Sequence, residues 1–353
     1  MIRRTIFYFV LFFQLANAET YWVRYGWEIF ANAGDGRSLA LGNTLTASGG
    51  GAIGPLFNPA LDPGISEFGL TYAHQSRFAG LINSDLGAFS LSNSLRWPIG
   101  IIVLHEGISN IADTRNILLD FGEDGQPGTG DAGEGDGILN DGERLDESNA
   151  VSFNHRQLAV MATKNWTAGK MKFGLGIKGL HHSLGQNLGT GFGLNVGFLY
   201  RLWNGSALGI NLSDVSSSWI VWDNGSIEAS APQAAVGFYQ QITSERIPVS
   251  VGLAADLLID PSGETPDDDF QILDKAGADI RWGLETTVKE KVSVRLGRNR
   301  SKAYTAGLGL RWTFAAIDYA FQTAPAGSAL GTSHFISFSV NPEWIMERIK
   351  TIL

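Results

Sequence analysis

Apolar residues alternate with small or polar residues along most of the chain, and the alternation repeats in short segments. In 191–201 (GFGLNVGFLYR), Phe192, Leu194 and Val196 alternate with glycine and asparagine. A period of two, with branched and aromatic residues on one face, is the signal of a β-strand. About fourteen segments show it. They are 66–77, 81–92, 96–107, 150–163, 170–182, 189–202, 206–214, 230–242, 246–258, 275–288, 290–299, 302–312, 314–322 and 333–340.

The connections between these segments are of two kinds. Some are tight turns, such as 167–169 and 203–205, whereas 108–149, 215–229 and 259–274 are long. An even number of strands joined by alternating short turns and long loops is the layout of an outer-membrane β-barrel. The pattern therefore predicts an all-β fold, an antiparallel transmembrane barrel of about fourteen strands spanning 66–340.

The composition of the two strand faces separates a membrane barrel from a soluble sandwich. A sandwich would turn a charged face to water, but here the second face is mostly Gly, Ser and Asn, and charged residues make up only 17% of the chain. Each Lys or Arg facing lipid at mid-bilayer costs about 2–4 kcal/mol. Tryptophans near segment ends fit the aromatic girdles of a barrel. They are Trp97, Trp166, Trp203, Trp219, Trp222 and Trp312.

The first residues have the organisation of an export signal. Arg3 and Arg4 precede the apolar run 5–15, and 16–18 (ANA) supplies a small-x-small cleavage pattern. A membrane anchor is the alternative, but the cleavage pattern favours a signal peptide over 1–18 and an exported protein. Because the chain has no cysteine, disulfides cannot stabilise it, and a large core or a closed sheet must do so.

The net charge of −9 comes from one segment. Between Asp120 and Glu147 there are ten acidic residues and one basic residue, Arg144, so this segment carries −9 and the rest of the chain sums to zero. No basic surface for nucleic acid is expected. Within it, 131–143 (DAGEGDGILNDGE) resembles a Ca²⁺ loop, with spaced oxygen donors, a glycine and a later Glu. The candidate ligands are Asp131, Glu134, Asp136, Asn140 and Glu143.

Two interpretations of this loop stay open. It either binds Ca²⁺, the one cofactor that the sequence suggests, or it is an acidic solvated loop. Ala132 stands at the first ligand position of the alignment and donates nothing, although Asp131 is next to it.

The sequence gives little sign of an enzyme. Residues 174–179 match GxGxxG, but they lie within a predicted strand and no helix follows, which excludes a dinucleotide site. There is no GxSxG, no thiol, and no pair of acids that stands out as a catalytic dyad. We therefore predict that the protein is not an enzyme.

Three stretches resemble one family. Residues 34–64 (GDGRSLALGNTLTASGGGAIGPLFNPALDPG) are similar to the N-terminal signature of the PorV/PorQ outer-membrane proteins, within the FadL-type barrel superfamily. Residues 281–322 and 330–340 resemble the last hairpins and the closing strand of that family. The chain departs from it in the long 108–149 insert and in the tail 341–353, for which we expect a short periplasmic helix.

The resemblance implies an N-terminal plug, or hatch, in residues 19–65, folded inside the barrel. Its apolar, proline-rich end 51–64 would close the lumen. The implied plug or gate residues are Arg37, Gly42, Gly54, Pro55, Asn58, Pro59 and Ala60. Alternation places further ionisable residues on the inner face, either as structural salt bridges or as a polar path or dock for the plug. They are Asp256, Arg281, Glu285, Arg295, Arg311 and Asp318.

Three functions are compatible with this sequence. The resemblance favours a PorV/PorQ-type barrel in the outer membrane of a Gram-negative bacterium, serving export or surface attachment of proteins with type IX secretion-like machinery. The first alternative is a FadL-type transporter of hydrophobic small molecules. The second is a structural barrel with a calcium-binding loop. The expected partners are accordingly membrane lipids, with secreted proteins, secretion machinery or hydrophobic small molecules.

Overall fold

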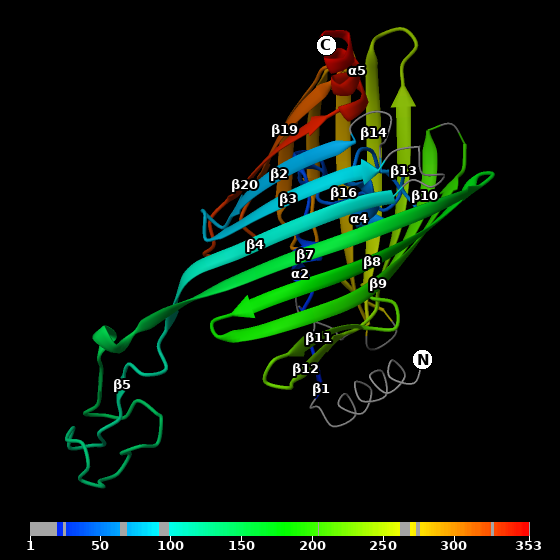
Figure 1. The fold of residues 1–353 in the computed structure, drawn as a ribbon. Coiled ribbons are helices and arrows are strands. Elements are labelled where there is room, and N and C mark those ends of the chain that lie inside the picture. The colour runs from blue at the N-terminus through cyan, green and yellow to red at the C-terminus, as the bar shows by residue number, and fades with distance from the viewer. Residues whose placement is uncertain are drawn as a thin grey trace.

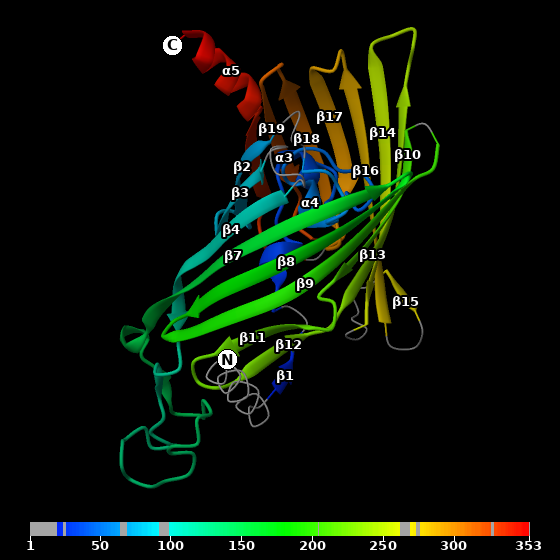
Figure 2. The ribbon, with the colours of Figure 1, turned by 45° about the vertical axis from the view of Figure 1, so that its right-hand side comes forward.

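The computed structural model describes residues 20–23, 26–63, 69–91, 99–203, 205–261, 269–272, 276–325 and 328–352. The predicted signal peptide 1–18 and Trp97 lie outside these residues. The described chain forms one closed barrel, shown in Figures 1 and 2.

Fourteen of the described strands form the wall of the barrel, and each pairs antiparallel with its neighbours. β20 closes the ring by pairing with β2, with Leu70 opposite Val340. The predicted fourteen-stranded antiparallel barrel is confirmed. The strands of the wall are β2 (Leu70–Arg77), β3 (Ile82–Leu91), β4 (Ile99–Asp113), β7 (Val151–Ala168), β8 (Met171–Leu184), β9 (Asn187–Arg201), β10 (Ser206–Ser213), β13 (Gln233–Thr243), β14 (Val249–Asp260), β16 (Ala276–Val288), β17 (Val292–Arg298), β18 (Tyr304–Arg311), β19 (Ala315–Gln322) and β20 (Ser333–Val340).

Alternation decides which side chains face outward. Along β9 every second residue is buried in the lumen, and the exposed residues between them include Phe192 and Val196. Such rows of exposed apolar side chains continue around the barrel, for example Val294 and Leu296 on β17. An outward apolar surface on a closed sheet is what contact with lipid requires.

The tryptophan interpretation was wrong for one residue. Trp166, Trp203, Trp219 and Trp312 are exposed, but Trp222 is buried. Buried and exposed residues alternate along β11 (Ser218–Trp222), so Ser218, Ile220 and Trp222 all face the inner side. Trp222 therefore packs in the lumen and belongs to no outer girdle.

The predicted long connections contain additional strands. The connection 215–229 folds as a hairpin of β11 and β12 (Ile227–Ser230), and β1 (Thr20–Trp22) adds to β12 in parallel. β15 (Phe270–Ile272) pairs with β16 in the connection after β14. Between β4 and β7, the two-residue strands β5 (Leu118–Leu119) and β6 (Arg144–Leu145) enclose the acidic segment, and the short 3-10 helix η1 (Glu147–Asn149) follows them.

These connections lie at one end of the barrel, which we call the long-loop end; the opposite, short-turn end carries the tight turns. At the short-turn end the chain continues from β20 into α5 (Pro342–Ile352), which projects from the barrel in Figure 2. The Trp344 ring stacks on Phe314, with ring centroids 4.5 Å apart. Among the described helices, none is long and apolar enough to cross a membrane.

Residues 26–63, the inner segment, run through the lumen. They form three short helices, α2 (Glu28–Ala31), α3 (Gly36–Ala40) and α4 (Gly54–Phe57). α2 contacts β4 and β7, while α3 contacts β17 to β20 on the opposite wall. A segment that touches opposite walls of a closed barrel lies inside it, and Figure 1 shows it there.

The lumen has an apolar half and a charged half. Leu45, Ile53 and Leu56 of the inner segment pack with Leu86 and Met161, which face inward from β3 and β7. The inward residues of β14 to β19 are instead rich in charge, with Asp256, Arg295 and Asp318 all buried. The inner segment thus has a hydrophobic contact on one side and a polar contact on the other.

Candidate functional site

A network of ion pairs joins α3 to the charged half of the wall. Asp35 caps α3 by accepting the Ser38 backbone N–H at 2.7 Å, and Arg37 lies in the turn that this cap closes. The Arg37 guanidinium then lies 2.9 Å from the Glu285 carboxylate. Arg295 extends the network, 3.4 Å from Glu285 and 2.6 Å from Asp318. Three predicted lumen residues are therefore joined to one predicted plug residue.

A second attachment is centred on Asp256. Its Oδ2 accepts from the Thr46 backbone N at 3.1 Å and the Thr46 hydroxyl at 2.7 Å, and Arg281 donates to it at 3.0 Å. Asp256 is 2% exposed. A buried carboxylate is stabilised when a cation and hydrogen-bond donors surround it, so Asp256 holds the inner segment and Arg281 together.

The turn at Asn58 fixes the end of the inner segment. Asn58 is fully buried; its amide donates to the carbonyls of Thr46 (2.8 Å) and Phe198 (3.1 Å), and its Oδ1 accepts the Ala60 N–H at 3.0 Å. Pro59 follows without a backbone N–H to satisfy. One side chain therefore connects two parts of the inner segment to β9.

Glycines in the wall allow this close approach. A Cβ at Gly174 would overlap the backbone of Pro59, and one at Gly197 would overlap Asn58 and Ala60. Sequence reasoning did not assign these two glycines to the site. Their signal was present, because glycine inside a strand marks a place where another backbone comes close.

Of the remaining predicted residues, some lie in the inner segment and one is not buried in the lumen. Gly54 and Pro55 begin the buried helix α4, with proline where a helix tolerates it. Gly42 has a positive φ of 65° beside the backbone of Arg298, which leaves no room for a side chain. Arg311 alternates inward, but as the last residue of β18 it is exposed, unlike the other five predicted lumen residues.

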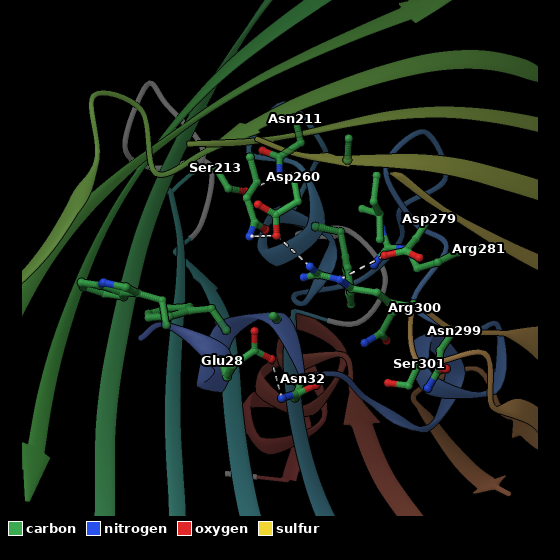
Figure 3. A pocket seen from close by; sticks show the side chains of 18 of the residues that line it. Glu28, Asn32, Asn211, Ser213, Asp260, Asp279, Arg281, Asn299, Arg300 and Ser301 are labelled. Atoms are coloured by element: carbon green, nitrogen blue, oxygen red, sulfur yellow. Dashed lines mark hydrogen bonds and ion pairs between the residues drawn. The ribbon is translucent and has the colours of Figure 1, made fainter. Parts of the chain in front are cut away.

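A cavity of about 790 Å³ lies between the inner segment and the wall, toward the long-loop end. The inner segment supplies Trp27, Phe30, Leu56 and Phe57 to its lining. Strands and turns of the charged half supply polar residues, of which Asp260, Asp279 and Arg300 are prominent in Figure 3. The cavity is therefore amphipathic, with aromatic rings on one side and charges on the other.

Ion pairs order the charged side of the cavity. Arg300 lies between two carboxylates, with its Nη2 2.9 Å from Asp260 and its Nε 3.4 Å from Asp279. Lys178 lies 2.5 Å from Asp214, and its ammonium stands over the rings of Trp27 and Phe30 at 4.8 and 5.1 Å from their centroids. These partners come from different elements, so none of the pairs could be read from the sequence.

Glu28 enters the cavity from α2. Its carboxylate accepts the Asn32 amide at 3.0 Å and lies across the open centre of the pocket from Asp260 and Arg300 (Figure 3). Burial raises the pKa of Glu28, and the positive charge of Arg300 opposes that shift. Sequence reasoning missed Glu28, because a lone Glu in a short helix carries no motif.

The acidic segment is folded on itself and extends away from the barrel wall (Figure 1). Asp131 accepts the Asp124 N–H at 2.7 Å, and Glu143 accepts those of Gly122 and Asn140 at 2.9 and 2.7 Å. Glu134 accepts from Gly128 and Gly130, while Asn140 donates to Asp136 at 3.1 Å. In the described residues no three acidic or histidine side chains are grouped as a metal site. The calcium site stays a prediction.

Comparisons with known proteins identify the fold. No family model and no curated protein matches the chain. Among solved structures, the toluene transporter TodX of Pseudomonas putida is similar, with a TM-score of 0.52 and 14% identity over 88% of this chain and 98% of TodX. The CymD monoaromatic hydrocarbon channel has a TM-score of 0.47 and 10% identity, covering 86% and 96% of the two chains.

TodX is a toluene transporter. At this level of identity the likeness shows the fold alone. It agrees with the predicted barrel and gives no support for the PorV/PorQ family in particular. The chain shares its barrel fold with the toluene transporter TodX.

Proposed function

We propose that the protein is an outer-membrane barrel that takes up small molecules with an apolar part, and that the inner segment is its plug. The cavity of about 790 Å³ carries this proposal, because its size suits a small molecule and it lies between the inner segment and the wall. The FadL-type fold shared with the toluene transporter TodX supports it.

The plug interpretation is supported by the attachments around the lumen. The inner segment hydrogen-bonds to Gln75 on β2, Asn165 on β7, Thr305 on β18 and Ser337 on β20. Contacts distributed around the ring would hold a segment across the lumen, and uptake would require some of these contacts to break.

Flux across proteoliposomes tests the proposal. Vesicles containing the purified barrel should take up naphthalene derivatives faster than vesicles containing a barrel with a disulfide between the inner segment and the wall, introduced at Thr46→Cys and Asp256→Cys, whose side chains meet at 2.7 Å. Reducing the disulfide should restore the flux. Equal flux in the oxidised and reduced states, at the level of empty vesicles, would reject uptake.

Protein export or surface attachment is the second candidate, and the resemblance of 34–64 to the PorV/PorQ signature is the observation that favours it. It is tested by deleting the gene for this protein in the source bacterium. Exported proteins that accumulate in the periplasm of the deletion strain, with uptake of small molecules unchanged, would establish this function in place of transport.

A further inference from the structure

The charged residues that line the cavity fall into two groups. Most are neutralised by a neighbour: Lys178 by Asp214, Arg300 by Asp260 and Asp279, Arg281 by Asp256 at 3.0 Å, and Lys302 by Asp269 at 3.7 Å. Glu28 differs. Within the described part of the chain, its carboxylate has the neutral Asn32 amide as hydrogen-bond partner and no ion pair.

Glu28 stands where a ligand would reach it. The residue is partly exposed, and its carboxylate points into the open centre of the pocket in Figure 3. A carboxylate accepts up to about four hydrogen bonds, and Asn32 provides one. The remaining acceptor positions are directed at the cavity, where a cationic donor would form a charge-assisted hydrogen bond.

Aromatic rings line the same cavity as this carboxylate. Trp27 and Phe30 flank Glu28 in the chain and line the same cavity, with their ring centroids 5.7 Å apart. These rings already hold one ammonium, that of Lys178. A cavity that holds both rings and a carboxylate without an ion pair among the described residues favours a ligand that combines a positive charge with an apolar part.

We propose that this pocket binds small organic cations in which an ammonium is attached to an apolar or aromatic group, with the Glu28 carboxylate as the counter-ion. The proposal rests on the proposed function, since it names the class of molecule that the barrel would take up. It excludes hydrocarbons as the best ligands, because they would offer the partly buried Glu28 carboxylate neither a positive charge nor a hydrogen bond.

A matched set of probes tests the charge. Naphthylmethylamine, naphthalenemethanol and naphthoate share one ring system and carry a positive, a neutral and a negative end group near neutral pH. Calorimetric titration of the full-length barrel in a non-ionic detergent should rank the amine first, by about tenfold or more over the alcohol, and naphthoate last. Equal affinities, or a preference for naphthoate, would overturn the proposal.

Two variants locate the effect. Glu28→Gln keeps the size and the hydrogen bond to Asn32 but removes the charge. The affinity for the amine should therefore fall to that for the alcohol, while the affinity for the alcohol stays the same. Glu123→Gln makes the same change on the exposed acidic segment and should leave the ranking intact. A ranking that survives Glu28→Gln, or that Glu123→Gln abolishes, would overturn the assignment to Glu28.

Binding and transport are separable in this design. If the amine binds in a Glu28-dependent manner but no probe crosses proteoliposomes, the ligand class stands and the uptake proposal falls. If all three probes cross at equal rates and bind equally, uptake stands and the ligand class falls.

Discussion

The inner segment and the acidic segment are both irregular parts of the chain, but they are held in opposite ways. In the inner segment, polar groups are buried and their partners are distant in sequence: Thr46 meets Asp256, 210 residues away, and Gly36 meets Ser337, 301 residues away. In the acidic segment the side chains are largely exposed, and Asp120 meets Gly135, 15 residues away.

The difference concerns what each region depends on. Exposed ion pairs and hydrogen bonds contribute about 0–1 kcal/mol each, whereas breaking a buried pair costs about 3–5 kcal/mol. The inner segment is therefore ordered by its contacts with the barrel, and each substitution that removes one contact should weaken its attachment. The acidic segment makes its contacts within itself and should be almost independent of the barrel.

The largest effect is expected for Asp256→Ala. It leaves Arg281 buried without its carboxylate and removes the acceptor of the two hydrogen bonds that Thr46 donates, so the attachment should weaken by about 3–5 kcal/mol. We expect a clear rise in the conductance of single barrels in planar bilayers. Asp120→Ala in the acidic segment is the matched control and should leave conductance unchanged. Unaltered conductance in Asp256→Ala would contradict this account of the attachment.

The fold could be predicted from sequence because its signal is local. A period of two fixes which side chains face lipid, and it located all fourteen wall strands, as for β9. The hairpin β11–β12 was missed because each of its strands is too short for alternation to stand out.

The candidate site could be predicted only in part. Alternation correctly placed Asp256 and Arg281 on the inner side, but their partners depend on strand register and on the path of the inner segment. Arg311 shows a further limit, because alternation gives the direction of a side chain and not its depth along the barrel. The role of Glu28 could not be predicted, because it depends on the cavity that surrounds this residue in the fold.

A smaller effect is expected for Asn58→Ala. The change leaves the carbonyl of Thr46 and the N–H of Ala60 without their partner, and each unsatisfied buried group costs about 1–3 kcal/mol. Hydrogen exchange of residues 44–62 should accelerate while that of the strands does not. Asn224→Ala, which removes a turn hydrogen bond to Ser226 in the exposed β11–β12 hairpin, is the control. Unchanged exchange in Asn58→Ala would show that Asn58 does not fix the segment.

Gly174→Ala should have a comparable or smaller effect through shape alone. The added methyl group overlaps the backbone of Pro59, and forcing extra volume into a packed site costs about 1–3 kcal/mol. We expect a lower melting temperature together with increased conductance. Gly179→Ala on the same strand meets no atom closer than 3.9 Å and should behave as the unmodified protein. Equal behaviour of the two variants would show that the inner segment accommodates the added methyl group without a loss of stability.

The smallest effects are expected in the acidic segment, and they should stay within it. The pKa of Asp120 is lowered because its carboxylate accepts the backbone N–H groups of Gly137 and Gly135. A carboxyl group whose pKa is lower in the folded state stabilises that state above its unfolded pKa of about 4, and the contribution is lost as the pH falls through the folded value. Limited proteolysis should therefore cut the segment faster below about pH 4 while the barrel still migrates as a folded species in gels.

The calcium prediction can be tested by the same proteolysis, because binding to this segment would change its own stability and little else. Millimolar Ca²⁺ should slow cleavage between β5 and β6, and Asp131→Asn together with Glu143→Gln should abolish the protection, while the melting temperature of the barrel stays the same. Cleavage that is indifferent to Ca²⁺ would reject the site and leave a solvated acidic loop. A rise in the barrel's melting temperature would instead break the contrast between the two regions, since it would show that the acidic segment is coupled to the wall beyond its two connections at β4 and β7.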